Sequence, residues 1–168
     1  MTEVKVRIDD TLSPERMREI GLFGALSDEV LRMLASQLKQ VRVPAGSTVF
    51  VEGDSAREMY VVLDGEVEVL KNSKKGRVQR VALLGPNDTF GEMSIIDVQP
   101  RSATVRAVAP VHLLRVAAED LDALYRHDLK AYALITLNLA RELSRRLRVT
   151  DRILADIAAS VLDEFVVK

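Results

Sequence analysis

The chain has 168 residues and a formal net charge of −1, with 48% hydrophobic and 29% charged residues. These values are typical of one soluble globular domain, and the small net charge excludes a strong overall attraction to nucleic acid or anionic lipid. The absence of cysteine excludes disulfides and thiolate metal sites. We find neither a secretory signal at the N-terminus nor an apolar run of about 20 residues, so we expect a cytoplasmic protein without membrane contact.

Two helix-start signals precede any strand pattern. Ser13 stands before Pro14, and Ser27 stands before an acidic pair, which are the residue types that cap helix N-termini. These signals predict a helical N-terminus over residues 13–39. We place the whole chain, residues 1–168, in a single domain.

Short strands follow over residues 40–116. The pattern predicts strands at 40–43, 48–52, 59–63, 66–69 and 78–84, separated by glycine and proline turns and by a turn at 72–76. Strands this short and this regularly spaced are typical of an antiparallel sandwich or barrel, and no helical segment between them allows a parallel crossover. The predicted fold class is therefore α+β and mainly β, with an antiparallel double-stranded β-helix of the jelly-roll or cupin-like type.

Helices are predicted over residues 117–165, because no glycine or proline occurs after Pro110. The longest runs over 129–161 and carries a stripe with alternating spacings of three and four: Ala133, Thr136, Ala140, Leu143, Leu147, Thr150, Leu154, Ile157 and Val161. This is the rhythm of a coiled coil. It predicts a long C-terminal dimerisation helix and a homodimer. The alternative is that the stripe packs only within its own subunit.

The segment TFGEMSIIDVQPRSATV, residues 89–105, carries the most specific polar chemistry. Gly91 allows close approach of the backbone to a ligand. Arg101, expected to begin the next strand, has a planar guanidinium that suits two oxygens of one phosphate, and the Ser102 hydroxyl adds a donor. Glu92 accepts hydrogen bonds only and therefore suits sugar hydroxyls. The alternative is a salt bridge between Arg101 and Glu92 across a loop.

The same segment resembles the phosphate-binding cassette of the cyclic-nucleotide-binding domain family, whose pattern is FGE, a short helix and R-[ST]-A. The resemblance extends over about residues 20–160, through PAG at 44–46 and FVEGD at 50–54. It implies that the Gly91 N–H, Glu92 and Arg101 contact the ligand, with Glu92 on the ribose 2′-hydroxyl and Arg101 on the cyclic phosphate. The full set that it implies is Phe90, Gly91, Glu92, Met93, Arg101, Ser102 and Ala103.

The stretch RRLRVTD, residues 145–151, resembles the dimer helix of the catabolite-activator branch of this family. That resemblance implies that Thr150 reaches the adenine amino group and that Asp151 reaches the base from the other subunit. Considered by itself, a polar Thr150 in an apolar stripe could instead only fix the helix register. Serine at position 102 implies cAMP as the ligand, with cGMP or a cyclic dinucleotide as alternatives.

These observations predict a stand-alone sensor that binds a cyclic nucleotide and signals in trans to an unidentified protein partner. In the family's transcription factors a DNA-binding domain follows the dimer helix. Here the sequence ends near that point and acidic residues interrupt the arginines of residues 141–152, so direct DNA binding is not expected. An interaction scaffold that binds no nucleotide and a DNA-associated regulator acting through these arginines are the alternatives.

Enzymatic activity is not expected. His112 and His127 are isolated in the sequence, and the carboxylates form no motif typical of a metal site. No nucleophile triad or Walker-type loop is found. We therefore predict no catalytic residue, no metal and no catalytic cofactor.

Overall fold

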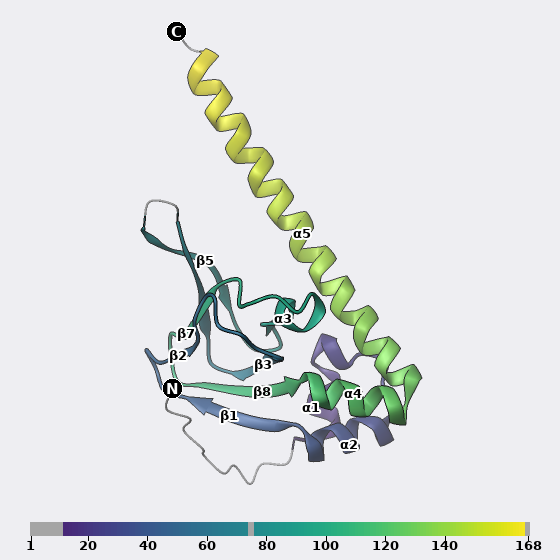
Figure 1. Ribbon diagram of the computed structural model, residues 1–168. Helices are drawn as coiled ribbons and strands as arrows, with labels where there is room; N and C mark the ends of the chain where they lie inside the picture. Colours follow the sequence, from purple (N-terminus) through teal and green to yellow (C-terminus); the bar gives the residue numbers. More distant parts are fainter. Residues whose placement is uncertain (1–11, 74–75, 167–168) are drawn as a thin grey trace.

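The computed structural model of this chain describes residues 12–73 and 76–166, with side chains up to Val161. Within them helices flank a pair of antiparallel sheets (Figure 1). The predicted combination of helices and antiparallel sheet is confirmed. The first ten residues, where no secretory signal was found, lie outside the described residues, as do Lys74 and Lys75 of the turn expected at 72–76.

The N-terminal region contains α1 (Pro14–Arg18), a 3-10 helix η1 (Gly21–Phe23) and α2 (Asp28–Gln37). Both predicted caps form, because the Ser13 hydroxyl accepts a hydrogen bond from the Arg16 N–H and the Ser27 hydroxyl accepts one from the Val30 N–H. These bonds satisfy donors that a helix start leaves unpaired.

Eight strands form two four-stranded antiparallel sheets within the described residues. Their bounds are β1 (Lys39–Val43), β2 (Thr48–Phe50), β3 (Glu58–Asp64), β4 (Val67–Asn72), β5 (Val78–Leu84), β6 (Thr89–Phe90), β7 (Thr104–Ala107) and β8 (Val111–Ala117). The strand orders are β1-β8-β3-β6 and β2-β7-β4-β5. A short helix, α3 (Met93–Ile96), lies between β6 and β7.

Strands β3 and β8 of the first sheet are buried on both faces. Alternate side chains such as Val61 and Leu114 face the helices, where they pack with Phe23, whereas Val62 and Leu113 face the second sheet. Because side chains of a strand alternate between faces, one sheet can serve two hydrophobic cores. The second sheet covers only one of them, through residues such as Val67 and Val105.

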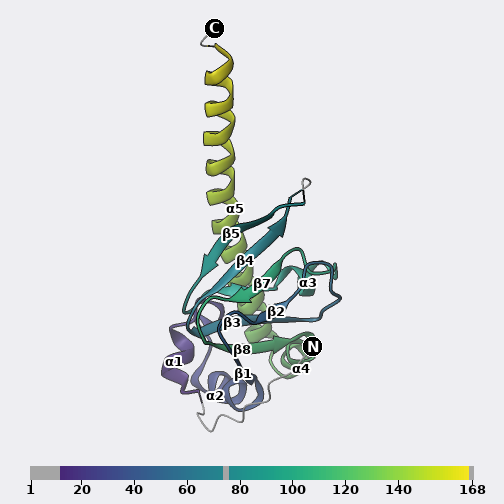
Figure 2. The same cartoon turned by 90° about the vertical axis from the view of Figure 1, so that its left-hand side faces the viewer.

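The C-terminal helices are α4 (Ala118–His127) and α5 (Leu129–Val166). The first turns of α5 pack on the helical core through Ala131, Ile135 and Leu139. Beyond this base α5 passes the side of the roll and projects well past it (Figures 1 and 2). The apolar side chains of its outer part, including Leu147 and Leu154, are exposed within the chain.

One expectation about the strands is wrong. Arg101 does not begin a strand, since β7 starts at Thr104. The Arg101 backbone is held by another loop instead: its N–H donates to the Asp54 carbonyl at 2.8 Å, and its carbonyl accepts from the Gly53 N–H at 2.9 Å. These bonds fix the position of Arg101 before the ladder of β7 begins.

Candidate ligand-binding site

A cavity of about 670 Å³ lies between the second sheet, the segment around α3 and the middle of α5. Three parts of the fold therefore contribute to it. The predicted residues that line it are Phe90, Gly91, Glu92, Met93, Arg101, Ser102, Ala103 and Thr150. Asp151 is not among the lining residues of its own chain; the prediction placed it in a cavity of the other subunit.

The polar end of the cavity is formed by the turn before α3. Gly91 has a backbone φ of +80°, and a Cβ atom at this position would lie 2.6 Å from the Arg101 Nη1 atom. This position therefore requires glycine for both its backbone conformation and its close contact. The turn brings the backbone of residue 91 against the guanidinium of residue 101.

Arg101 is the most buried charged side chain of the site, with 1% of its side chain exposed. Its Nη1 atom donates to the Glu58 carbonyl at 2.7 Å and to the Gly91 carbonyl at 3.0 Å, and its Nη2 atom donates to a Glu58 carboxylate oxygen at 3.1 Å. The guanidinium also stacks on the Phe50 ring, 3.9 Å from the ring centroid. The Nε atom has no hydrogen-bond partner among the described residues.

The charge of Arg101 is held in place by its surroundings. Burial lowers the pKa of Arg101 from its ordinary value, while the nearby Glu58 carboxylate opposes that shift. A guanidinium stays protonated even when its pKa falls somewhat. The sequence left open a salt bridge between Arg101 and Glu92. In the structure Arg101 forms its ion pair with Glu58 instead.

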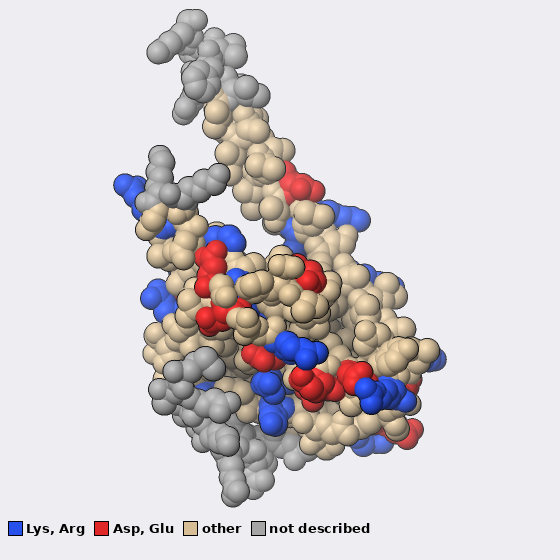
Figure 3. Space-filling view, viewed as in Figure 1, with Lys and Arg blue, Asp and Glu red and all other residues tan. Residues whose placement is uncertain are grey.

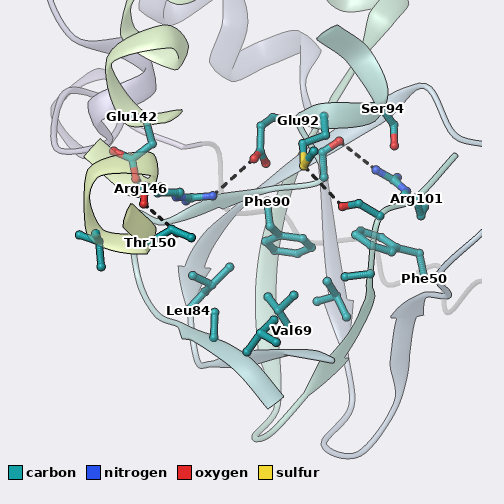
Figure 4. Close-up of a pocket in the computed structure, with 18 of the residues that line it drawn as sticks. Phe50, Val69, Leu84, Phe90, Glu92, Ser94, Arg101, Glu142, Arg146 and Thr150 are labelled. Carbon is teal, nitrogen blue, oxygen red and sulfur yellow. Dashed lines mark hydrogen bonds and ion pairs between the residues drawn. The ribbon is translucent and has the colours of Figure 1, made fainter. Parts of the chain in front are cut away.

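Glu92 pairs instead with an arginine of α5. The Glu92 side chain is 7% exposed, and its Oε1 atom lies 3.5 Å from Arg146 Nη1. Arg146 also donates to the Thr89 carbonyl at 2.5 Å and to the Glu142 carboxylate at 3.1 Å. Figure 4 shows Arg146 reaching from α5 across the cavity edge toward Glu92. This contact fastens the middle of α5 to the turn that carries the polar end.

A second carboxylate, that of Glu142 on α5, belongs to the same cluster. Glu142 accepts a hydrogen bond from Arg145 at 2.7 Å and pairs with Arg146. The hydrogen bond from Arg145 is the largest cause that holds the pKa of Glu142 below its usual value; the positive charge of Arg146 acts in the same direction, and partial burial opposes it.

The rest of the cavity wall is apolar. It is lined by Phe50, Val69, Val81, Ala82, Leu84 and Val105 from the strands and by Val149 and Ile153 from α5. The pairing of β4 with β5 shifts register between Val69 and Leu70, which leaves Val81 without a partner in the ladder. A bulge of this kind redirects side chains, so adjacent residues of β5 both reach the cavity. A polar end and an apolar end together suit a ligand with one charged and one flat apolar part.

Thr150 lies on α5 opposite this apolar wall. Its hydroxyl donates to the Arg146 carbonyl one turn earlier, at 3.0 Å, so the hydroxyl hydrogen is engaged while the oxygen can still accept. The position on α5 also makes Thr150 part of the exposed apolar stripe. One residue therefore lies at both the cavity and the outer face of the helix.

Sequence reasoning missed the α5 residues Glu142, Arg145 and Arg146, as well as the apolar wall. The arginines were recognised in the sequence, but only as part of a basic stretch. A signal for Arg146 does exist, since it stands one helical turn before Thr150. The strand residues of the apolar wall give no comparable signal. Alternation of polar and apolar residues shows that one face of a strand is buried, but it does not show whether that face lines a core or a cavity.

The conclusions from geometry agree with comparisons to known proteins. The family model described as "Cyclic nucleotide-binding domain" matches residues 40–128. A "CRP-like cAMP-activated global transcriptional regulator" of Mycobacterium tuberculosis is 34% identical over 85% of this chain and 62% of its own length. The "Cyclic AMP receptor protein" of Thermus thermophilus is 36% identical over 80% of this chain and 61% of its own length.

Solved structures give the same result. A cyclic nucleotide-binding domain from Methylobacillus flagellatus has a TM-score of 0.77 at 32% identity and covers 86% of this chain and 82% of the other. The Thermus thermophilus catabolite activator protein has a TM-score of 0.72 at 36% identity, covering 82% of this chain and 63% of its own.

The chain belongs to the cyclic nucleotide-binding domain family. It spans about three fifths of the length of the curated regulators that it matches. Within the part of the chain that the structure describes, no helix is long and apolar enough to cross a membrane. The side chains of residues 12–73 and 76–161 also contain no group of three or more potential metal ligands.

Proposed function

We propose that this protein is a cytoplasmic sensor that binds cAMP and passes the state of its pocket to a separate protein partner. The single observation that carries the proposal is the convergence of the cassette and Thr150 of α5 on one cavity of about 670 Å³. The relatives whose printed names include cAMP activation or a cyclic AMP receptor support the choice of ligand. Names of regulators and a receptor also support binding rather than catalysis as the function.

In the proposed complex the phosphate lies beside Arg101. The unpartnered Nε atom is directed to one phosphate oxygen, and a phosphate oxygen replaces the Gly91 carbonyl as acceptor for Nη1. Ser102, which is exposed beside Met93, supplies a hydroxyl donor, and the backbone of Ala103 completes this end. Phosphate oxygens are stronger acceptors for a guanidinium than a neutral carbonyl, so the exchange is favourable.

The sugar lies beside Glu92 in this proposal. Its buried carboxylate keeps lone pairs beyond the one directed at Arg146 and can accept from a ribose hydroxyl. Phe90 and Met93 contact the sugar and the adjacent face of the ligand. Binding therefore adds a ligand contact to a carboxylate that already fastens α5.

The base lies against the apolar wall and beside Thr150. Because the hydroxyl hydrogen of Thr150 is donated to its own helix, its oxygen acts as an acceptor. The exocyclic amino group of adenine is a donor, whereas guanine carries an acceptor at the equivalent position. This match supports cAMP over cGMP, and a cyclic dinucleotide would require a second phosphate site.

We also propose that two copies pair through the outer part of α5. The exposed stripe of Leu147, Leu154, Ile157 and Val161 keeps the three-four spacing of a coiled coil and supports such a homodimer. Asp151 of each copy would then approach the base in the other subunit.

Consecutive strands alternate between the two sheets, except for the hairpin of β4 and β5. This alternation supports placing the roll in the jelly-roll class.

The dimer has its own test. Leu154→Glu places a carboxylate on the stripe, and we expect the dimer to weaken by roughly tenfold or more because two unpaired charges become buried. Ala155→Glu adds the same charge outside the stripe and serves as the control. Sedimentation equilibrium measures both, and equal dissociation of the two variants would contradict the assigned face.

Arg101→Ala tests the proposed function against a scaffold that binds no nucleotide. We expect the variant to lose cAMP affinity by about two orders of magnitude, because several charge-assisted bonds disappear, while circular dichroism remains that of a folded protein. If the variant and the original protein respond equally to cAMP in thermal melts, the sensor proposal is wrong and the scaffold replaces it.

A further inference from the structure

Four arginines form a row along one side of α5: Arg141, Arg145, Arg148 and Arg152. Their spacings of four, three and four place them within an arc of roughly 60° at the 3.6 residues per turn of an α-helix. All four are exposed. The row, which we call the arginine stripe, extends over about 16 Å at 1.5 Å per residue. In Figure 3 blue side chains are visible along the middle of α5.

The acidic residues that interrupt this stretch in the sequence do not interrupt the stripe in space. Glu142 faces the cavity and pairs with Arg146 there. Asp151 lies about 90° from the centre of the stripe by helical geometry. Asp156 stands one turn after Arg152 and marks the end of the row. The helix therefore separates charges that alternate in the chain.

Most of the positive charge of the stripe is not compensated by the side chains that the structure describes. Arg145 pairs with Glu142, and Arg141 donates to the neutral Asn138 side chain at 3.2 Å. Arg148 and Arg152 have no ion pair within residues 12–73 and 76–161. Uncompensated like charges in one row repel one another, so an anionic partner would stabilise this surface.

The stripe stays accessible when two copies pair. Its centre lies about 155° around α5 from the apolar stripe of Leu143, Leu147, Leu154 and Val161, so a second copy docked on the apolar stripe would not cover it. The stripe is therefore free to contact a molecule other than the second copy of this chain.

We propose that the arginine stripe docks an acidic helix of the partner protein, with carboxylates at the same four-three-four spacing. This proposal rests on the proposed function for the existence of a partner. The positive charge and the spacing of the stripe indicate which chemistry that partner would carry. Two facing helices with matching spacing can pair all four charges, and each guanidinium presents a fork that fits a carboxylate. Arg145 also lines the cavity, so an acidic partner competes with Glu142 for it.

A carboxylate-bearing helix fits better than a nucleic acid. A duplex carries a charge every 1.7 Å or so along its axis on a broad surface, whereas the stripe is a single row beside Asp151 and Asp156. The chain as a whole has a net charge of −1, which gives no overall attraction to a large polyanion. A narrow row of carboxylates needs only the local positive charge of the stripe.

The test uses a labelled, capped alanine-rich helical peptide with four glutamates at spacings of four, three and four. A second peptide has the same composition with its glutamates distributed around the helix. Fluorescence anisotropy measures both against the full chain and against a variant with Arg141→Gln, Arg148→Gln and Arg152→Gln. The matched control, Arg32→Gln with Arg57→Gln and Arg77→Gln, removes the same charge from exposed positions elsewhere.

We expect the stripe variant to bind the ordered peptide roughly tenfold more weakly than the original protein, as three exposed ion pairs would give. The affinity of the control variant for the ordered peptide should stay within about twofold of that of the original protein. The scrambled peptide should bind weakly to all three proteins. Equal affinity of the stripe variant and the control would overturn the proposal. A labelled DNA duplex that binds more tightly than the ordered peptide, and only when the stripe is intact, would overturn the assignment to a protein partner. Calorimetric titration of the stripe variant with cAMP reports nucleotide binding separately, because none of its three changed residues lines the cavity.

Discussion

Arg146 of α5 and Glu92 of the turn before α3 form an ion pair of 3.5 Å across the edge of the cavity. Glu92 is almost fully buried, and Arg146 also holds the Thr89 carbonyl. The pair therefore connects the helix that would carry a signal to the residue proposed to hold the sugar. In the proposed complex, the Glu92 carboxylate would contact both the ligand and the arginine that positions α5.

Breaking this pair should cost stability. We expect Arg146→Met to lower the free energy of unfolding by about 1–3 kcal/mol, because the Glu92 carboxylate stays buried without its cation. Combining it with Glu92→Gln should recover part of that loss, with a coupling energy on the order of 1 kcal/mol in the double-mutant cycle. Urea unfolding without nucleotide measures all four proteins.

The control for this cycle is Arg148→Met, which removes an exposed arginine of the same helix. We expect its unfolding free energy to stay within about 0.5 kcal/mol of the original protein. Strictly additive effects of the Arg146 and Glu92 changes would show that the two side chains do not interact in solution.

Gly91→Ala should disturb both the backbone and the guanidinium. A left-handed φ costs an alanine about 1–2 kcal/mol, and the new methyl group would lie 2.6 Å from Arg101 Nη1. Gly46→Ala has a similar φ of +75° with nothing within 4 Å of the added atom, so it isolates the backbone cost. We expect only Gly91→Ala to weaken cAMP binding in calorimetry. Equal affinity of the two variants would argue against a role for this turn.

Thr150→Val keeps the shape of the side chain and removes its acceptor. If the hydroxyl oxygen accepts from the adenine amino group, cAMP affinity should fall about fivefold, as the loss of one neutral hydrogen bond predicts. Affinity for cGMP should change little or rise. A uniform loss for both nucleotides, measured by competition binding, would mean that Thr150 contributes packing and not base selection.

The Glu142 cluster predicts a pH dependence. Because the hydrogen bond from Arg145 and the charge of Arg146 lower the pKa of Glu142 in the folded chain, its carboxylate stabilises the fold above the unfolded pKa. That contribution is lost as the pH falls through the pKa that Glu142 has in the folded chain. The melting temperature of the original protein should therefore exceed that of Glu142→Gln near neutral pH, and the difference should shrink below about pH 4.5. A difference that grows on acidification would contradict this account.

Local features of the fold could be predicted from the sequence because local chemistry decides them. Ser13 and Ser27 cap helices through their own hydroxyls, and strand β5 was predicted with its observed bounds. The cassette was recognised because its residues are close in the chain. By contrast, the Arg146–Glu92 pair depends on where α5 crosses the roll, and tertiary packing sets that crossing.

Two other features depend on geometry that a sequence pattern does not contain. The bulge at Val81 comes from a one-residue shift in the pairing of β4 with β5, and the neighbouring strand decides which residue of β5 is left unpaired. The start of β7 was misplaced because the loop at Asp54 takes the Arg101 N–H. In both cases a long-range partner decides the local backbone.

The central claim is tested most directly by calorimetric titration with cAMP and cGMP of protein that has first been unfolded and then refolded. Refolding removes nucleotide retained during purification, which mass spectrometry of the released fraction would identify. We predict saturable heat for cAMP with one site per chain, weaker binding of cGMP and a higher melting temperature in the presence of cAMP. No heat with either nucleotide, together with an unchanged melting temperature, would contradict the assignment of this cavity as a cyclic-nucleotide site.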